Sequence, residues 1–240
     1  MSDYRDVAVE VTIAAPIEVV WRALRDRDDV RRWHGWEFDG LDEEVEVIYF
    51  ADEPGSEEQG EGPRRRLVRG GNVFELEQRG EGTVVRVVMA EPPDSDAWHG
   101  WYADIRHGWF TFVQQLRFYV ERHAGEDRRT LVLSGMPVEE DQPELPVLLG
   151  LAEAAAGTPY AASLPTGDEI TGTVWFVDEH QVGVTVDAWG DGLLEVTRGR
   201  TPAGAILTVY GTDPTGLEAR WQTWWGKHFS APAAEGWSAP

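Results

Sequence analysis

Residues 101–123 read WYADIRHGWFTFVQQLRFYVERH. Large apolar side chains recur in this stretch at intervals of three and four residues, which places them on one face of a long α-helix. These side chains are Tyr102, Ile105, Trp109, Phe112, Val113, Leu116 and Val120. Gly108 interrupts the run at a cost of up to about 1 kcal/mol relative to alanine, which close packing or the close approach of a ligand would explain. A helix with so broad an apolar face needs a surface to cover it.

The sequence before this helix reads as two short helices and a series of antiparallel strands. An alternating strand covers 7–13, Pro16 opens a first helix, and Asp26 or Asp28 caps a second helix that ends near Trp33. Glycine-rich turns separate the later strands. Those strands are predicted at 45–50, 64–69, 73–78 and 83–89. The stretch between the first two of them holds Gly, Pro, Glu and Ser, and we expect a loop there.

A similar order of elements returns in the second half of the chain, after a polar break at 124–127. The predicted elements are a strand at 130–134, a helix at 144–156, strands at 171–177, 181–186, 193–198 and 205–210, and a helix at 217–229. The sequence therefore predicts a first domain at 1–124, a second, smaller lobe at 125–230 and a frayed tail at 231–240. A degenerate duplication would explain the recurrence, and so would chance similarity between strand–turn sequences.

Four segments of the first half resemble the START-like (SRPBCC) superfamily. They are IAAPIEVVW at 13–21, WHGW at 33–36, GTVVRV at 82–87 and the run from Gly108 to Leu116. The resemblance implies an α+β helix-grip fold, in which a curved antiparallel sheet wraps around a long C-terminal helix. We expect a second, degenerate copy of similar element order to follow. Within the superfamily the chain is most similar to bacterial homologues of a heat-shock chaperone ATPase activator, although it lacks the basic Arg-Lys-x-Lys motif of the eukaryotic activators.

Composition excludes several classes of partner and chemistry. The formal net charge of −22 opposes binding to nucleic acids and anionic membranes, because such binding draws its affinity from basic side chains. No apolar run approaches the ~20 residues of a membrane-spanning helix, and the first residues do not read as a signal peptide, so we expect a cytoplasmic protein. The chain has no cysteine, which excludes disulfides and thiolate chemistry. We expect no cofactor and no metal site.

The superfamily uses a cavity between sheet and long helix for lipids, polyketides, hormones and antibiotics, and the resemblance implies such a cavity here. We expect non-catalytic binding of a hydrophobic, aromatic or polyketide-type molecule, for sequestration, transport or self-resistance. The expected ligand-binding residues are Trp33, Trp36, Phe38, Tyr102, Ile105, Trp109, Phe112, Val113 and Leu116. His-Gly-Trp triplets at 34–36, 99–101 and 107–109 would form a rim of indoles and imidazoles. Alternatively, the tryptophans pack in the core and the histidines are solvated.

A sharper form of this hypothesis comes from the START-like resistance proteins of enediyne antibiotic producers, which the chain also resembles. In those proteins a drug radical removes a hydrogen atom from a glycine and the chain is cut. The candidate glycines here are Gly35, Gly100 and Gly108.

Two other functions stay open. A polyketide cyclase or aromatase would use polar groups in the cavity to move protons, and the residues to test would be Tyr102, His107, Glu75 and Arg86. Glu75 and Glu77 share one face of their strand, where they form an acid–base pair or a solvated patch. A chaperone ATPase co-regulator is favoured only by the resemblance. Trp221, Trp224, Trp225 and Phe229 form an apolar stripe on the last predicted helix, which indicates core or an interface between lobes.

Overall fold

The chain divides into two compact units, Met1–Glu126 and Asp127–Pro240. The computed structural model describes residues 6–52, 54–69, 71–89, 96–199 and 202–230, and for 6–8, 89 and 96–105 it describes the backbone alone. The predicted tail at 231–240 lies outside the described residues. In the described part, no helix is both long enough and apolar enough to cross a membrane.

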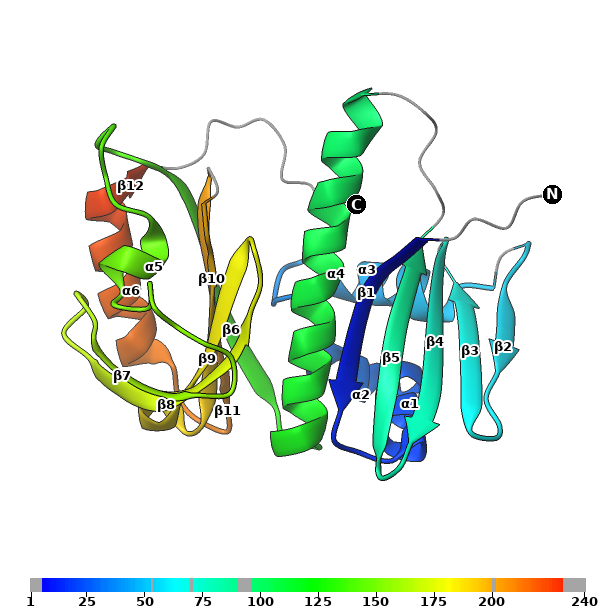
Figure 1. Cartoon of the computed structure of the whole chain (residues 1–240). Coiled ribbons are helices and arrows are strands. Elements are labelled where there is room, and N and C mark those ends of the chain that lie inside the picture. The colour runs from blue at the N-terminus through cyan, green and yellow to red at the C-terminus, as the bar shows by residue number, and fades with distance from the viewer. Residues whose placement is uncertain (1–5, 53, 70, 90–95, 200–201, 231–240) are drawn as a thin grey trace. The chain divides into compact units, whose positions relative to one another are not determined.

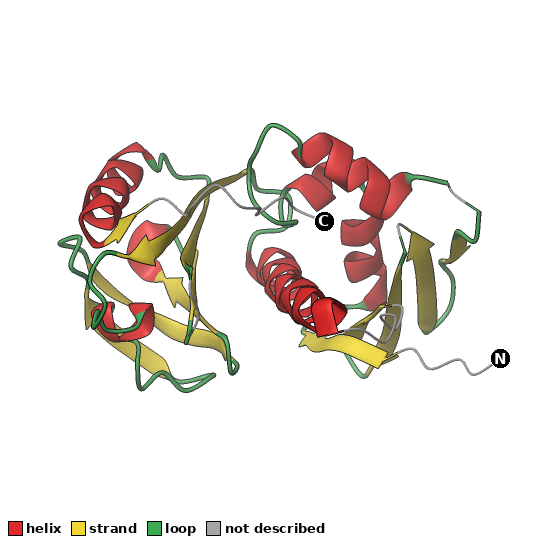
Figure 2. Ribbon diagram, turned by 90° about the horizontal axis from the view of Figure 1, so that it is seen from above, coloured by secondary structure: helices red, strands yellow, loops and turns green. Residues whose placement is uncertain are grey.

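Unit 1 is a five-stranded antiparallel sheet with helices on one face (Figures 1 and 2). Its elements in chain order are β1 (Asp6–Ile13), α1 (Ile17–Arg25), α2 (Arg27–Arg31), α3 (Leu41–Val45), the π-helix η1 (Glu46–Phe50), β2 (Glu57–Gln59), β3 (Arg64–Arg69), β4 (Asn72–Arg79), β5 (Gly82–Met89) and α4 (Asp96–Arg122). The strands lie in the order β1-β5-β4-β3-β2, so the first strand pairs with the last.

Strand alternation decides which residues of unit 1 enter its core. Phe74 and Leu76 of β4 pair with Val87 and Val85 of β5, and all four side chains are buried. The long helix α4 runs beside β1, and its residues Trp109, Val113 and Leu116 are buried as well (Figure 1). This arrangement confirms the predicted helix-grip fold.

A buried hydrogen bond ties the end of α4 to α2. The hydroxyl of Tyr119 donates to Oδ1 of Asp29 at 2.5 Å, and the backbone N–H of Gly125 donates to the Tyr119 hydroxyl oxygen at 2.9 Å. Burial and the hydrogen bond to Asp29 raise the pKa of Tyr119 to about 12. Asp26 caps α2, because its side chain accepts from the backbone N–H groups of Asp28 and Asp29. The cap thus stabilises α2, and the bond from Tyr119 holds it against the long helix.

Unit 2 repeats the pattern with a larger sheet. Its elements are β6 (Arg128–Pro137), α5 (Leu145–Leu148), β7 (Pro159–Ser163), β8 (Glu169–Val177), β9 (Gln181–Val186), the 3₁₀-helix η2 (Asp187–Trp189), β10 (Gly192–Thr197), β11 (Ala203–Tyr210), α6 (Thr215–His228) and β12 (Phe229–Ser230). The order is β12-β6-β11-β10-β9-β8-β7. The first strand, β6, again pairs with the last long strand, β11, and the buried face of the sheet packs with α6. The expected second copy is therefore present, with β7 and β12 in addition.

Three sequence-based expectations about elements were wrong. Residues 45–50 form helix instead of a strand, because Val45 and Tyr49 lie four residues apart and are both buried on one helical face. The helix expected at 144–156 spans only Leu145–Leu148. The loop expected between 50 and 64 contains strand β2, whose exposed residues carry no apolar signal.

Gly108 provides a test of the α4 assignment. A Cβ added at this residue would meet no heavy atom within 4 Å. We predict that Gly108→Ala stabilises the chain by about 0.5–1 kcal/mol, because alanine is the better helix former. Urea unfolding followed by circular dichroism measures this. Gly172→Ala should act in the opposite sense, since its Cβ would lie 2.1 Å from the carbonyl oxygen of Thr185. A destabilised Gly108→Ala would contradict the open environment at this position.

Candidate functional site

Aromatic rings fill the space between α4 and the sheet of unit 1. The imidazole of His34 lies at their centre, with its ring centroid 4.6 Å from that of Phe112, 5.3 Å from that of Tyr49 and 6.3 Å from that of Trp109. The other members are Trp33, Trp36 and Phe74. Most of these pairs meet edge to face, the arrangement that aromatic quadrupoles favour. We call these seven residues the ring cluster.

The ring cluster contains one polar chain. His34 is fully buried, and its Nε2 lies 2.9 Å from Oε1 of Glu44 while its Nδ1 lies 2.9 Å from the hydroxyl oxygen of Tyr49. A carboxylate only accepts hydrogen bonds, so Nε2 carries the proton that is donated to Glu44. In the neutral imidazole, Nδ1 then accepts from the Tyr49 hydroxyl. We call these three residues the relay.

The backbone of residues 41–50 explains how Glu44 and Tyr49, five residues apart, reach both nitrogens of one imidazole. In a regular α-helix, residues five apart point about 140° away from each other around the axis. The helix here changes to a π-turn over 46–50, in which the N–H of Ala51 donates to the carbonyl of Glu46 at 2.7 Å. A π-turn takes more residues per turn, so Tyr49 rotates back toward the side of Glu44. Such turns occur frequently at functional sites.

The electrostatics of the relay keep Tyr49 protonated. Complete burial raises the pKa of the Tyr49 hydroxyl well above its usual range, and the nearby charge of Glu44 raises it further. The Tyr49 hydroxyl is therefore a hydrogen-bond donor in this structure and does not act readily as a base.

The predicted ligand-binding residues are only partly brought together. Trp33, Trp36, Trp109 and Phe112 join the ring cluster, and Val113 and Leu116 are buried on the same helix. Phe38 is 41% exposed and Trp36 is half-buried. The side chains of Tyr102 and Ile105, and of His99 and Trp101 in the second triplet, lie outside the described residues. His107 is half-buried on α4.

Residues Trp109–Leu116 do not face a hollow on their inner side. His34 and Tyr49 have no exposed surface, and Trp33, Phe74 and Leu116 have 1% each. A void able to hold even one water molecule would expose the side chains that line it. The predicted rim of solvated or ligand-facing histidines is therefore wrong for His34, which is a buried and doubly bonded core residue.

The polar residues proposed for a cyclase include two that lie on the outer face of the sheet. Glu75 and Arg86 pair directly between β4 and β5, and strand alternation turns both away from Phe74 and Leu76. Glu75 meets Nε of Arg66 at 3.7 Å, and its side chain is 44% exposed. This placement contradicts a role for Glu75 or Arg86 beside the ring cluster.

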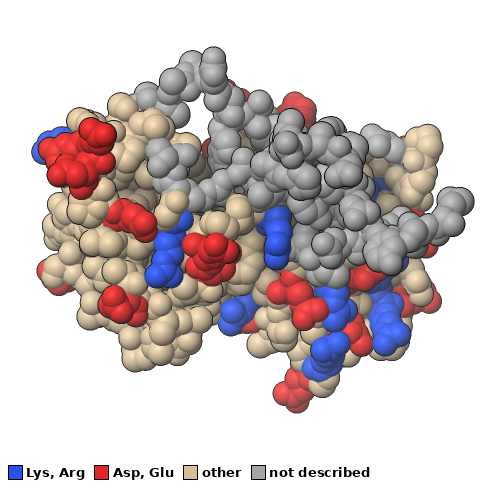
Figure 3. Space-filling view, turned by 45° about the horizontal axis from the view of Figure 1, so that its top comes forward, with Lys and Arg blue, Asp and Glu red and all other residues tan. Residues whose placement is uncertain are grey.

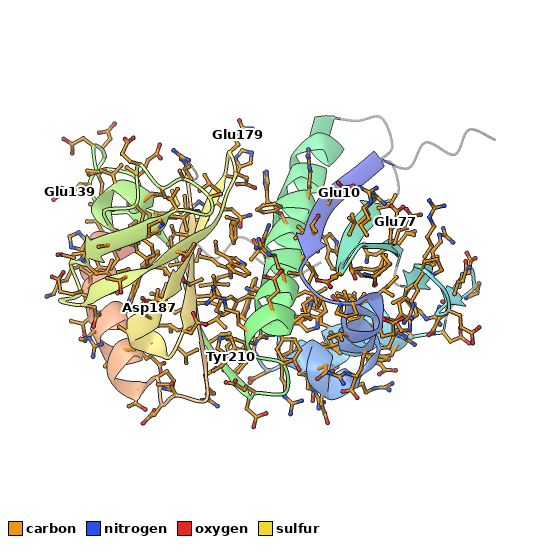
Figure 4. The ribbon with its side chains drawn as sticks, turned by 60° about the horizontal axis from the view of Figure 1, so that its bottom comes forward. Glu10, Glu77, Glu139, Glu179, Asp187 and Tyr210 are labelled. Carbon is orange, nitrogen blue, oxygen red and sulfur yellow. The ribbon has the colours of Figure 1, made fainter. Side chains whose placement is uncertain are left out.

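An ion-pair network covers this outer face. Arg86 reaches Glu10 at 2.5 Å on one side and Glu77 at 3.3 Å on the other; both acids are labelled in Figure 4. Hydrogen bonds from Arg79, Arg86 and Arg64 lower the pKa of Glu77. Glu77 is thus held ionised, which disfavours it as a proton donor. Acidic and basic side chains also lie interspersed on the face seen in Figure 3.

The remaining features considered from the sequence are the three candidate glycines and a metal site. Gly35 is buried with φ +55°, and a Cβ there would lie 3.7 Å from the Phe112 ring. Gly108 has open space at its Cα, and Gly100 belongs to the part of α4 described by its backbone alone. No group of three or more His, Asp or Glu among the described residues is arranged to hold a metal ion.

The relay could not be predicted from the sequence because Tyr49 was assigned to a strand at 45–50. In a strand, Glu44 and Tyr49 would point to opposite faces, since their spacing is odd. The four-residue spacing of Val45 and Tyr49 was the signal that could have revealed a helix over 41–50 and brought Glu44 and Tyr49 together.

No family model and no curated protein matches the chain. Two solved structures resemble it loosely. DynU16, a protein of the dynemicin biosynthetic locus, is 19% identical, with 90% of this chain and 93% of that chain covered and a TM-score of 0.31. The di-domain aromatase/cyclase StfQ from the steffimycin pathway is 12% identical, with 91% of each chain covered and a TM-score of 0.30. Likenesses this loose do not indicate what the present chain binds.

The relay can be tested as an energetic unit. We predict that Tyr49→Phe lowers the free energy of unfolding by about 1–3 kcal/mol, because it leaves a buried ring nitrogen unpaired. Combined with Glu44→Ala, the effects should be non-additive by at least about 0.5 kcal/mol, since both act through His34. Urea unfolding of the two single variants and the double variant measures this. The matched pair Tyr49→Phe with Glu43→Ala, an exposed neighbour, should be additive. Additivity in both pairs would show that the three groups do not act together.

Proposed function

We propose that unit 1 binds a hydrophobic small molecule, aromatic or of polyketide type, and sequesters, carries or neutralises it without catalysis. The observation that carries this proposal is the ring cluster with its single polar chain. Flat apolar surfaces accept the rings of such a ligand, and a few placed polar groups accept its oxygens.

The outer end of the ring cluster is the proposed entrance. Trp36 and Phe112 are half-buried there, with their ring centroids 6.1 Å apart. Phe38 and Val47, which are the exposed large apolar residues of the described part of unit 1, both lie in the segment 36–50. Apolar side chains that face water at one place favour a binding surface over a sealed core.

Access further inward would require movement of residues 41–50. Outside, this segment is held by ion pairs of Arg31 with Asp42 and of Arg27 with Glu46, each at 2.7 Å and largely exposed. Exposed pairs of this kind contribute about 0–1 kcal/mol each. Arg25 also donates to the backbone carbonyl of Tyr49. Displacing the segment also breaks the buried hydrogen bonds of His34, so the ligand must replace them: its rings take over the contacts of Phe112, and one of its oxygens takes the place of a relay partner.

The binding proposal predicts saturable binding of a polycyclic aromatic probe. Titration of the full chain with 1-hydroxyanthraquinone should quench tryptophan fluorescence to a plateau. Phe112→Leu should raise the dissociation constant about threefold to tenfold, the range that one aromatic pair contributes. Phe118→Leu is the matched control on the same helix, since Phe118 contacts His123 and not the ring cluster. A wild-type response without a plateau, or equal losses in both variants, would count against this site.

A second candidate function, polyketide cyclisation, is favoured by the order of donors and acceptors in the relay. Carboxylate, imidazole and hydroxyl follow one another as in acid–base triads. In this function the proton of Tyr49 would pass to Nδ1 of His34, and the phenolate would take an acidic methylene proton from the ligand. The raised pKa of Tyr49 opposes this step while the site is closed, so cyclisation ranks second.

The two functions can be separated with 1-phenyl-1,3-butanedione, whose central methylene protons exchange with deuterium. If the relay is a base, wild-type chain accelerates this exchange, and Tyr49→Phe returns it to the rate without protein. Glu75→Gln should leave the acceleration intact, because Glu75 lies on the outer face. Nuclear magnetic resonance follows the loss of the methylene signal. Exchange that is unaffected by wild-type protein would count against cyclisation by the relay.

A further inference from the structure

Unit 2 contains four buried tryptophans in successive ring contact. Trp189 of η2 meets Trp221 of α6 at 6.1 Å between centroids, Trp221 meets Trp224 at 5.8 Å, and Trp224 meets Trp225 at 6.1 Å. Each is at most 7% exposed. Within the described residues, the indole Nε1 of all four is buried without a hydrogen-bond partner.

Unpaired donors of this kind are costly. A buried N–H that has lost water without gaining an acceptor destabilises a protein by a penalty that most native structures avoid. The chain does pair a buried indole in unit 1, where Nε1 of Trp33 donates to the carbonyl of Ala23 at 2.8 Å. The edge-to-face contacts in unit 2 allow an N–H to face a neighbouring ring, which is a weaker interaction than a bond to oxygen. The tryptophans of unit 2 therefore retain unused capacity to donate.

One of these tryptophans, Trp224, lines a surface hollow of about 380 Å³ between α6 and the turn after β7. This volume falls at the lower end of the range of ligand sites, about 300–1,000 Å³. Arg220, Thr223 and Lys227 from α6 and Thr166 from the facing turn also line it. Residues 220, 223, 224 and 227 share one face of the helix because they recur at three and four.

The charge of this hollow differs from that of the chain as a whole. Lys227 is the only lysine in a protein of net charge −22, and within the described residues it makes no ion pair. Arg220, two turns earlier on α6, binds Asp168 at 2.7 Å. Arg220 also donates to the carbonyl of Gly216, so Lys227 provides the uncompensated charge. This cation at one end, the exposed edge of Arg220 at the other and an indole between them present a complementary surface to a flat, negatively charged molecule.

We infer that the hollow on α6 is a second ligand site, which binds an aromatic carboxylate. The ring of the ligand lies against Trp224, its carboxylate pairs with Lys227 and the exposed edge of Arg220, and an oxygen that reaches the floor supplies the acceptor that the indole N–H lacks. The hydroxyls of Thr166 and Thr223 already donate to Asp168 and to the carbonyl of Ala219, so the charged groups and the indole make the contacts with the ligand. This site belongs to unit 2 and does not depend on the function proposed for unit 1.

The probe for this site is 1-naphthoate, with the uncharged 1-naphthalenemethanol as its matched control. Isothermal titration calorimetry of the full chain should show that the alcohol binds at least about tenfold more weakly, the factor that one charge-assisted hydrogen bond contributes. Lys227→Ala should weaken naphthoate binding by a similar factor. Lys227→Arg should retain most of the affinity. Lys227 is exposed, so neither substitution disturbs the core.

Two controls locate the site. Arg198→Ala removes a positive charge of unit 2 outside the hollow and should leave naphthoate binding unchanged, as should Phe112→Leu in unit 1. In a spectrum of ¹⁵N-labelled indoles, naphthoate should shift the resonance that Trp224→Phe removes. Equal affinity of wild type and Lys227→Ala, equal affinity for naphthoate and the alcohol, or an unchanged Trp224 indole resonance would each overturn the proposal.

Discussion

The architecture of unit 1 around its long helix depends on the hydrogen bonds of the buried His34 imidazole. Both ring nitrogens are bonded to one helical segment, through Glu44 and Tyr49, and the rings of Tyr49 and Phe112 meet the imidazole edge to face. A polar group in such a place is tolerated only when its hydrogen bonds are complete. The requirement fixes the segment in rotation as well as in position, which a purely apolar contact would not do. The π-turn is the local deformation that satisfies it.

Prediction of the elements from the sequence succeeded where a single periodicity decides the structure. The long helix, the alternating strands and the glycine turns between them all followed from local patterns, and so did the second copy in unit 2. It failed at 45–50, where VEVIYF carries β-branched and aromatic residues typical of a strand. Burial of Val45 and Tyr49 on one side outweighed that propensity. The candidate site was missed with this segment, since Tyr49 belongs to it and Glu44 immediately precedes it. Alternation also placed Glu75 and Glu77 on one face of their strand but could not say that Phe74 marks the inner face.

The two units treat their tryptophans differently, although their sheets share one topology. In unit 1 the indole of Trp33 is paired with a backbone carbonyl, and the buried imidazole of His34 has a partner at each ring nitrogen. In unit 2 the four indoles described above pack on each other, and their N–H groups find no oxygen among the described residues. A common fold thus holds one core with a bonded polar chain and one with four indole donors that lack an acceptor, which favours separate roles for the two halves.

The sheet order also bears on how each unit reaches its native state. In unit 2, β6 is flanked by β11 and β12, so Pro137 pairs with Phe229 at the far end of the unit. A ribosome releases β6 long before either neighbour exists, and its hydrogen-bonding edges stay unoccupied throughout that interval. Contacts between such distant segments slow folding, because the chain must close a long loop before the pairing gives any gain. The meander from β7 to β10 can assemble from adjacent strands, whereas the first strand to be synthesised is among the last to become fully enclosed.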